Sequence, residues 1–499
     1  MGKAEIWKAE SRKGSARVSR AVFGVSPNTT FLFFAAATLL AGCTVGPDYH
    51  EPPANPPAEW ASPLRGGETN GVSPDARWWK SFRDPELDSL VARAAESNLN
   101  LRAAWARVRQ ARFQRVMAKA AFWPTIDANA SYSRNRFSAT GLVPAPPGTP
   151  LEANLYQTGF DSTWELDVFG GTRRSVEAAG AEVAAAEYGR RDILLTVYGD
   201  VARNYVQARA FQRRLAVLRE NIAAQQNILN LTRDLFARGL ATDLDVQQGA
   251  ALLATTQSEE PTLETSFRDS AYSLALLLGQ PPGALLAELS SNTPAPAAPP
   301  SVPVGLPSDL IHRRPDIQQA ERELAAATAR IGVAKADLFP QFSLTGNAGM
   351  ESVHASDWFD AGSRYWAAGP VAQWRIFDAG RIRANIHLQT ARQEEALANY
   401  EQAVLAAFGD VEGALTAYAH EQTRRLSLER AVEADQEAVR LAEQLYRNGL
   451  ADFLRVLESQ RSLYQSQDAL IDSDQAVSTN LIALYKALGG GWEQERIKN

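Results

Sequence analysis

The chain has 499 residues, of which 45% are apolar and 22% are charged, and its formal net charge is −6. This composition is that of a folded protein, and it excludes the basic surface that nucleic-acid binding requires. The five histidines are scattered without metal-ligand spacing, and no phosphate-binding glycine loop or nucleophile elbow is present. We therefore expect no metal site, no cofactor and no enzymatic activity.

The only cysteine, Cys43, follows a segment with the pattern of an export signal. Basic side chains in residues 1–30 precede the apolar run FLFFAAATLL, which is too short to span a bilayer permanently. Residues 1–42 are thus a predicted signal peptide. A lone cysteine is ordinarily a buried apolar residue. Here, however, Leu40-Ala41-Gly42-Cys43 is similar to the lipobox of bacterial lipoproteins, which makes Cys43 a predicted lipid anchor.

The sequence contains an internal duplication with an offset of 208 to 216 residues. For example, LFARGLATDLDV at 235–246 returns as LYRNGLADFLRV at 445–456. A period of this length indicates two copies of one large unit and not a solenoid. We expect a first repeat over 86–280 and a second repeat over 316–489.

Each repeat contains a segment in which apolar and polar residues alternate. The alternation predicts one β-hairpin over about 125–169 and another over about 341–377, each with an apolar and a polar face. A soluble sandwich is the ordinary interpretation of such strands. The hairpins are also long enough to cross a membrane, where four strands are too few to close a barrel and every edge must be paired. In that case several chains must contribute strands to one sheet.

Each hairpin is followed by a long helical pattern. Residues 173–237 contain no proline and carry apolar residues every seven positions, which predicts a helix with a coiled-coil seam. Asp243 is expected to cap a return helix over 243–279, and Pro261 is expected to kink it. The second repeat has the same pattern, with a long helix over 381–447 and a return helix over 452–488.

A proline-rich segment over 281–315 connects the repeats. Residues 279–315 contain nine prolines among 37 residues, and this composition alone favours a disordered linker. Because the two repeats must lie side by side, we favour an extended strap across the outside of the helices, at their equator.

Three stretches carry a family resemblance: CTVGPDYHEP from Cys43, LPSDLIHRRPDIQQAERELAAATARIGVAKADLFPQFSLTG from Leu306, and FDAGRIRAN from Phe377. They resemble the outer-membrane efflux lipoproteins of the TolC family, of the OprM and NodT type. The resemblance implies an α+β membrane protein that forms a trimer. Each protomer contributes four strands to a twelve-stranded outer-membrane β-barrel, and a twelve-helix periplasmic α-barrel continues it. Residues 43–85 would form a lipidated, extended N-terminal segment, and 490–499 a C-terminal tail.

The resemblance also implies a function and partners. The protein would be the outer-membrane exit duct of a tripartite efflux pump, conducting small toxic compounds or drugs passively from periplasm to exterior. An inner-membrane pump of the resistance-nodulation-division (RND) type would supply the energy, and a periplasmic adaptor would connect pump and duct. A diacylglycerol and an N-acyl chain on Cys43 would anchor the protein in the outer membrane of a Gram-negative bacterium. Thr44 favours that membrane, because it is not aspartate.

By the same resemblance, the two helix-turn-helix tips form the closed periplasmic end and the docking site of the adaptor. The tip residues are Arg238, Gly239, Leu240, Asn448, Gly449 and Leu450. The aperture would be lined by Glu458, which matches an acidic position of the family, and by Arg455, Asp243 and Asp245. Arg455 is expected to pair with Glu458 one helical turn away. A solvated charge on a helix face is the alternative for Glu458.

Two other functions fit part of the pattern. A type I protein-secretion duct would have the same fold, and the lipobox favours drug efflux over it only by analogy. A lipid-anchored periplasmic coiled-coil scaffold would explain the helices and Cys43, but it would leave four amphipathic strands without lipid to face.

Overall fold

The computed structural model describes residues 44–492, apart from gaps at 54–55, 64–67, 70–76, 141–147, 149, 292–295, 297 and 300–301. Cys43 and the lipobox residues Leu40, Ala41 and Gly42 lie outside the described residues, as do residues 493–499. The signal peptide and the lipid anchor therefore remain predictions.

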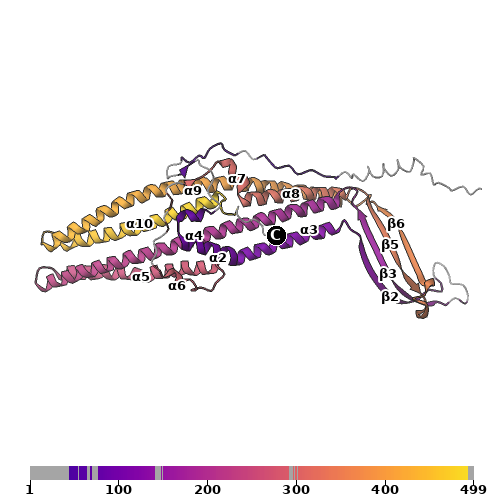
Figure 1. The fold of residues 1–499 in the computed structure, drawn as a ribbon, viewed down its shortest axis with the longest axis horizontal. Helices are drawn as coiled ribbons and strands as arrows, with labels where there is room; N and C mark the ends of the chain where they lie inside the picture. Colours follow the sequence, from indigo (N-terminus) through magenta and orange to yellow (C-terminus); the bar gives the residue numbers. More distant parts are fainter. Residues whose placement is uncertain are drawn as a thin grey trace, which may run out of the picture. The chain divides into compact units, whose positions relative to one another are not determined.

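Two long helical hairpins make up much of the described chain (Figure 1). Their four helices are α4 (Gly171–Ala237), α5 (Asp243–Leu277), α9 (Arg381–Arg447) and α10 (Phe453–Ala487). Helices α4 and α9 contain 67 residues each, so each is about 100 Å long at the helical rise. Pro261 lies within α5 and does not end it. No helix in the described part of the chain combines the length and apolarity that a membrane span requires.

Shorter helices pack beside the long ones. Helix α3 (Leu99–Ala120) packs on α4, and α8 (Pro315–Ala336) packs on both α4 and α9. Helix α10 also contacts both α4 and α9, but along the halves of these helices that are nearer the tips (Figure 1). The space between α4 and α9 is therefore filled by α8 along one half and by α10 along the other.

Four antiparallel strands form one sheet. They are β2 (Thr125–Arg136), β3 (Glu152–Leu166), β5 (Gln341–Ser352) and β6 (Arg364–Gln373), in the order β2-β3-β5-β6. Phe160 of β3 pairs with Ala348 of β5, so the two hairpins join in the middle of the sheet. Strand β6 ends at Gln373, before the predicted limit of 377. The chain turns there toward α9, where Asp378 accepts hydrogen bonds of 2.9 and 2.8 Å from two backbone N–H groups at the helix start.

The sheet leaves large apolar side chains uncovered in the single chain. Ile126, Phe160 and Trp366 are 69%, 61% and 78% exposed. The only other sheet among the described residues is a pair of two-residue strands, β1 (Glu68–Thr69) and β4 (Val302–Pro303). The four-stranded sheet is therefore not one half of a sandwich in this part of the chain.

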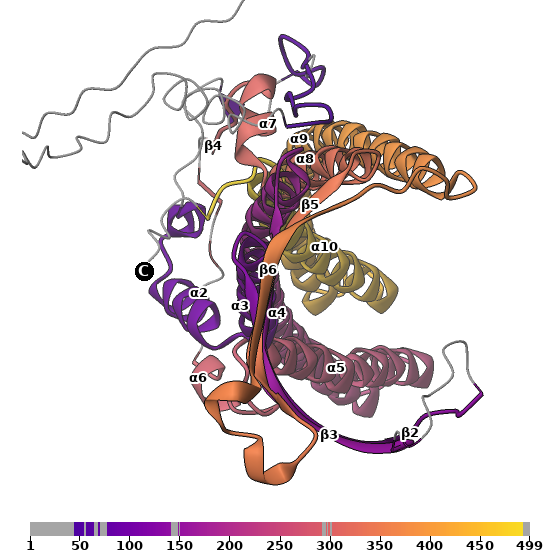
Figure 2. The ribbon, with the colours of Figure 1, turned by 90° about the vertical axis from the view of Figure 1, so that its right-hand side faces the viewer.

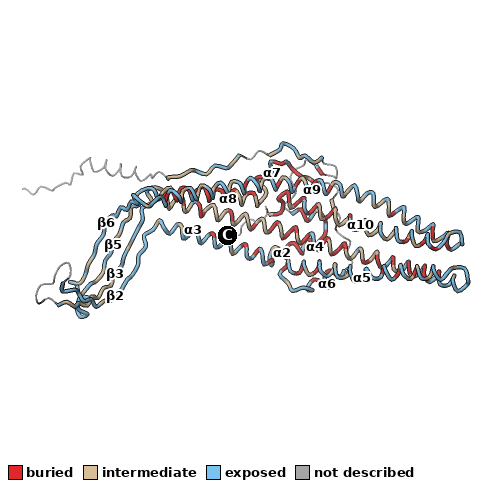
Figure 3. Tube along the Cα trace, turned by 180° about the vertical axis from the view of Figure 1, so that it is seen from behind, coloured by how far each residue is buried: buried red, intermediate tan, exposed pale blue. Residues whose placement is uncertain are grey.

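The main apolar core lies midway along α4. It contains Trp78 and Phe82 of the 3-10 helix η1 (Trp78–Phe82), together with apolar residues of α2 (Pro85–Ser97), α4 and α10. Trp78 stacks on Tyr485 of α10 with ring centroids 5.3 Å apart. Buried residues concentrate along α4 and near this core, whereas the sheet and the helical tips are mostly exposed (Figure 3).

The sequence predicts an extended strap over the proline-rich segment 281–315. The structure differs, because this segment is not extended throughout. Its described part contains α6 (Leu286–Leu289), β4 and α7 (Pro307–Arg313). Leu289, Val302 and Leu310 are buried in the main core, so burial of these apolar side chains folds the segment locally. Figure 2 shows α2, α6, α7 and β4 on the same side of α4.

Candidate functional site

The two tips have the same backbone geometry. Gly239 and Gly449 have φ angles of 74° and 68°, which is the left-handed conformation that glycine adopts at helix ends. The following leucines donate backbone hydrogen bonds of 2.9 and 2.8 Å back into the helix. Leu240 and Leu450 are both 73% exposed. Each tip, with Arg238 or Asn448 at its helix end, therefore presents an apolar side chain to its surroundings.

The helices that leave the tips begin with different caps. Thr242, not Asp243 as predicted, caps α5: its hydroxyl accepts from the N–H of Asp245 at 3.2 Å, and the Asp245 carboxylate accepts from the N–H of Thr242 at 2.8 Å. This capping box needs an acidic residue three positions after the cap, which only Thr242 has. Asp243 is then the first helical residue. Asp452 caps α10, accepting from the N–H of Arg455 at 3.2 Å.

Glu458 and Arg455 lie near the start of α10 and are both exposed. The Arg455 Nη1 donates to the Glu458 carboxylate at 3.5 Å, as predicted from their spacing. An exposed pair of this kind contributes little to folding stability. Both side chains can therefore contact a molecule that binds at this end of the helices.

A buried polar contact joins the two hairpins just behind the tips. Tyr446 of α9 donates its hydroxyl to Thr232 of α4 at 3.3 Å, and its ring packs against Phe453 with centroids 5.4 Å apart. Ile228, Ala442 and Val456 complete this apolar cluster. Burial raises the pKa of the Tyr446 hydroxyl, which therefore stays a neutral donor.

Further along the helices, ion pairs connect α4 with α10. Arg214 donates to both carboxylate oxygens of Asp468, at 2.6 and 2.8 Å. Arg213 pairs with Asp474 at 2.6 Å. A bidentate arginine–carboxylate pair fixes the relative position of two helices more strictly than a single contact.

Residues 90–280 and 306–490 match the family of outer membrane efflux proteins, which covers both long hairpins and the four-stranded sheet. The chain belongs to this family. The resemblance inferred from its motifs is confirmed.

Known relatives of this efflux protein match it over most of their length. The pyoverdine export outer membrane protein OpmQ of Pseudomonas putida is 37% identical over 449 residues, which are 88% of this chain and 93% of OpmQ. The toluene efflux pump outer membrane protein TtgI, also of Pseudomonas putida, is 32% identical over 466 residues, which are 92% of this chain and 97% of TtgI. The solved structure of the outer-membrane channel OprN is 35% identical and matches 90% of this chain and 100% of its own with a TM-score of 0.84.

The described N-terminal residues of the efflux protein pack at the end of the sheet, in a slot formed by Phe169, Arg174 and Gly332. The N–H of Val45 donates to the carbonyl of Phe169 at 3.1 Å, and Arg174 donates to Asp48 at 2.6 Å. This guanidinium lowers the pKa of the Asp48 carboxyl. Gly332 of α8 forms the floor of the slot, since a Cβ there would lie 2.9 Å from the Val45 carbonyl oxygen. Residue 44 is thereby placed where β3 leads into α4.

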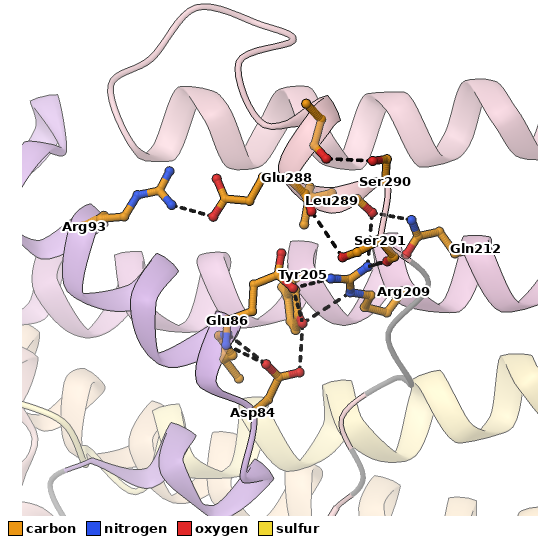
Figure 4. Close-up of polar contacts among 12 residues, drawn as sticks. Asp84, Glu86, Arg93, Tyr205, Arg209, Gln212, Glu288, Leu289, Ser290 and Ser291 are labelled. Atoms are coloured by element: carbon orange, nitrogen blue, oxygen red, sulfur yellow. Dashed lines mark hydrogen bonds and ion pairs between the residues drawn. The ribbon is translucent and has the colours of Figure 1, made fainter.

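A buried polar network ties α2, α4 and α6 together (Figure 4). Arg209 is fully buried and donates to the Glu86 carboxylate, to the Tyr205 hydroxyl at 3.2 Å and to the Leu289 carbonyl at 3.1 Å. Tyr205 donates in turn to Asp84, the cap of α2, at 2.8 Å. Within the described residues, no group of three or more His, Cys, Asp or Glu side chains could hold a metal ion.

Sequence reasoning missed Tyr446, Arg174 and Arg209. The duplication holds one clue, because Tyr446 corresponds to Phe236 of the first repeat. Phe236 is 45% exposed, whereas Tyr446 is buried and uses the extra hydroxyl. The two arginines carry no such signal, since the carboxylates that tie them to other elements, Asp48 and Glu86, lie more than 100 positions away in the chain.

Proposed function

We propose that the protein is the outer-membrane exit duct of a tripartite RND-type efflux pump, conducting small toxic compounds passively from periplasm to exterior. The observation that carries this proposal is the family match through both hairpins and the sheet. The names of two relatives, a pyoverdine export protein and a toluene efflux pump protein, support small molecules as cargo. An inner-membrane pump and a periplasmic adaptor are the partners that such a duct needs.

The duct is a trimer. Strands β2 and β6 are the two edges of the four-stranded sheet, and within the described part of the chain neither strand pairs with another on its outer side. In lipid each unpaired backbone group costs several kcal/mol, so the edges must be paired. Three protomers that pair β2 with β6 of a neighbour close a twelve-stranded barrel. Their long helices continue it as a twelve-helix tunnel, whose walls are joined within each protomer by the α4–α10 ion pairs.

The tips form the gate and the docking surface for the adaptor. Arg238, Gly239, Leu240, Asn448, Gly449 and Leu450 make up this surface, and the two exposed leucines give it apolar contacts. Glu458, Arg455, Asp243 and Asp245 line the aperture. The buried hydrogen bond from Tyr446 to Thr232 holds the two hairpins together in the closed state. Opening requires the second hairpin to move away from the first at this contact.

The lipid on Cys43 anchors the duct in the outer membrane. Thr44, which would follow the acylated residue directly, is the first described residue and lies against Gly170. This position is at the end of the sheet, and it supports an anchor in the lipid that surrounds the barrel.

Deletion of the gene in its own bacterium tests the exit-duct function. We expect a higher intracellular accumulation of ethidium, measured by fluorescence, and its reversal by the full-length chain. Unchanged accumulation of ethidium and of other toxic cations and solvents, together with loss of one protein from the culture medium, would instead indicate a type I secretion duct.

A further inference from the structure

A cavity of about 600 Å³ lies where α8 begins and α10 ends. The two helices meet end to end between α4 and α9. Arg314, which precedes α8, donates to the carbonyl of Ala487, the last residue of α10, at 3.3 Å. Neither helix fills this junction, and the adjacent helices place small residues there. Gly199 of α4 and Gly409 and Gly413 of α9 line the space. The cavity thus arises because α10 ends and α8 begins at this junction and neither helix fills the space between α4 and α9.

On α4 and α9 the cavity lies on the face that is turned away from the apolar core, whereas Ile482 and Ala487 of α10 line the cavity and also belong to the core. On α4, Val197 and Val201 pack in the core, whereas Asp192 and Gly199 line the cavity. The core elements α2, α6 and α7 lie on the other side of α4 (Figure 2). In the proposed trimer these elements and the proline-rich segment are outside, so the cavity faces the conduit.

Most of the charged side chains in the cavity are paired with one another. The pairs are Arg314 with Asp316 at 2.6 Å, Arg314 with Asp410 at 3.0 Å, and Arg203 with Asp200 at 2.8 Å. Asp192 of α4 and Lys486 of α10 are the exceptions: among the described residues, neither side chain has an ion pair or hydrogen bond. The cavity therefore offers one free negative and one free positive group.

The charged form of Asp192 is destabilised at this position of the fold. Burial raises the pKa of its carboxyl, and the nearby charge of Asp316 raises it further, while Lys486 and Arg314 act in the opposite direction. A half-buried carboxylate without a hydrogen-bond donor from the protein is only partly hydrated, which disfavours its charged form. Such residues are concentrated at functional sites.

We propose that this cavity binds small amphoteric molecules that carry a protonated amine and an anionic group on an apolar body. Asp192 binds the amine and Lys486 binds the anionic group. Leu195, Ala414 and Ile482 of the lining contact the apolar body. The volume lies in the range of small-molecule sites. The proposal rests on the proposed function, because the ligand enters from the conduit.

Three dansyl probes test the proposal on the purified full-length protein in detergent. Nε-dansyl-lysine carries both charges, dansyl-cadaverine carries only the amine, and dansyl-aminohexanoate carries only the carboxylate. We expect saturable fluorescence enhancement with the highest affinity for dansyl-lysine. Asp192→Asn should weaken the two amine-bearing probes by about tenfold or more and leave dansyl-aminohexanoate unchanged. Lys486→Gln should weaken the two carboxylate-bearing probes and leave dansyl-cadaverine unchanged.

Gly413→Leu is expected to fill the cavity with little disturbance of its walls. A Cβ at this position meets no heavy atom within 4 Å, and leucine favours a helix over glycine. We expect this variant to lose all three probes while its melting temperature stays the same or rises. The matched control is Asp269→Asn, which changes an exposed carboxylate of α5 outside the cavity and should leave all affinities unchanged.

Two results would overturn the proposal. One is equal affinity of the wild type, Asp192→Asn and Gly413→Leu for dansyl-lysine. The other is a protein that conducts ions in a planar bilayer but binds none of the probes, which would leave the exit-duct function intact. A protein that binds the probes with the expected charge dependence but does not conduct would support the cavity site and contradict the duct.

Discussion

Glu458 is an exposed carboxylate near the start of α10, and the Arg455 guanidinium lies 3.5 Å from it. In the proposed trimer three such pairs meet at the aperture, where a ring of carboxylates attracts cations. Replacing Glu458 by alanine is expected to loosen the closed tip and to raise the ion conductance of the reconstituted channel severalfold.

Glu437→Ala is the matched control for this variant. Glu437 pairs with Arg440 at the same helical spacing and with similar exposure, but it lies farther from the tip on α9. Its removal is expected to leave the conductance unchanged. If Glu458→Ala also leaves it unchanged, Glu458 is a solvated surface charge and not part of the gate.

Tyr446 loses one hydrogen bond when it is replaced by phenylalanine. The hydroxyl donates to Thr232 across the two hairpins, and such a bond contributes about 1 kcal/mol. We expect Tyr446→Phe to shift the opening equilibrium by about fivefold, seen as more frequent openings in single-channel records. Thr232→Val should have a similar effect, and the double variant should not add to it. Additive effects would show that the two residues do not act through this bond.

Asp192 gives the fold a pH dependence. Because the pKa of its carboxyl is raised in the folded state, stability falls as the pH rises through that raised value. The Asp192→Asn variant does not lose stability in this way as the pH rises. We expect its melting temperature to exceed that of the wild type near neutral pH and to equal it below the ordinary aspartate pKa of about 4. An equal difference at both pH values would contradict the assignment, and would point to the other charged groups of the cavity: Asp200, Arg203, Arg314, Asp316, Asp410 and Lys486.

Among the secondary-structure elements, the sequence predicts best those whose ends and faces are set by nearby residues. The long helices end near the predicted positions 237 and 447, because Gly239 and Gly449 supply the left-handed residue that ends a helix. Alternating apolar residues place the four strands for an equally local reason, since successive side chains in a strand point to opposite faces.

The sequence is less informative where a second residue, near or far along the chain, decides between two local preferences. The cap of α5 is Thr242, because its reciprocal partner Asp245 outweighs the simple preference for aspartate at Asp243. Local composition predicts an extended strap, whereas burial of Leu289 against α2 and α4 folds that segment. The contact of Tyr446 with Thr232 joins the two repeats across 214 positions, and no local pattern marks it.

The N-terminal segment depends on close backbone contact with α8. Gly332 provides this contact, since a Cβ there would lie 2.7 Å from the Arg174 Cγ and 2.9 Å from the Val45 carbonyl oxygen. Gly332→Leu is expected to displace the segment and to speed hydrogen exchange of the Val45 amide. Gly409→Leu, where a Cβ meets nothing within 4 Å, is the control. Unchanged exchange in Gly332→Leu would mean that the slot does not hold the segment.

At the scale of the whole molecule, the single chain is incomplete in two respects. The sheet has two unpaired edges, β2 and β6, and it exposes Phe160 and Trp366 among other large apolar residues. In the proposed trimer, neighbouring chains pair these edges and lipid gives these side chains an apolar environment. The proposed gate and docking tips depend on this assembly.

The most direct test of the central claim is single-channel recording of the purified full-length protein in a planar bilayer, with native mass spectrometry of the same sample. We expect a trimer, a lipid adduct on the processed chain, and discrete low-conductance openings. A monomer without conductance would contradict the shared barrel and would leave a lipid-anchored helical scaffold as the better account.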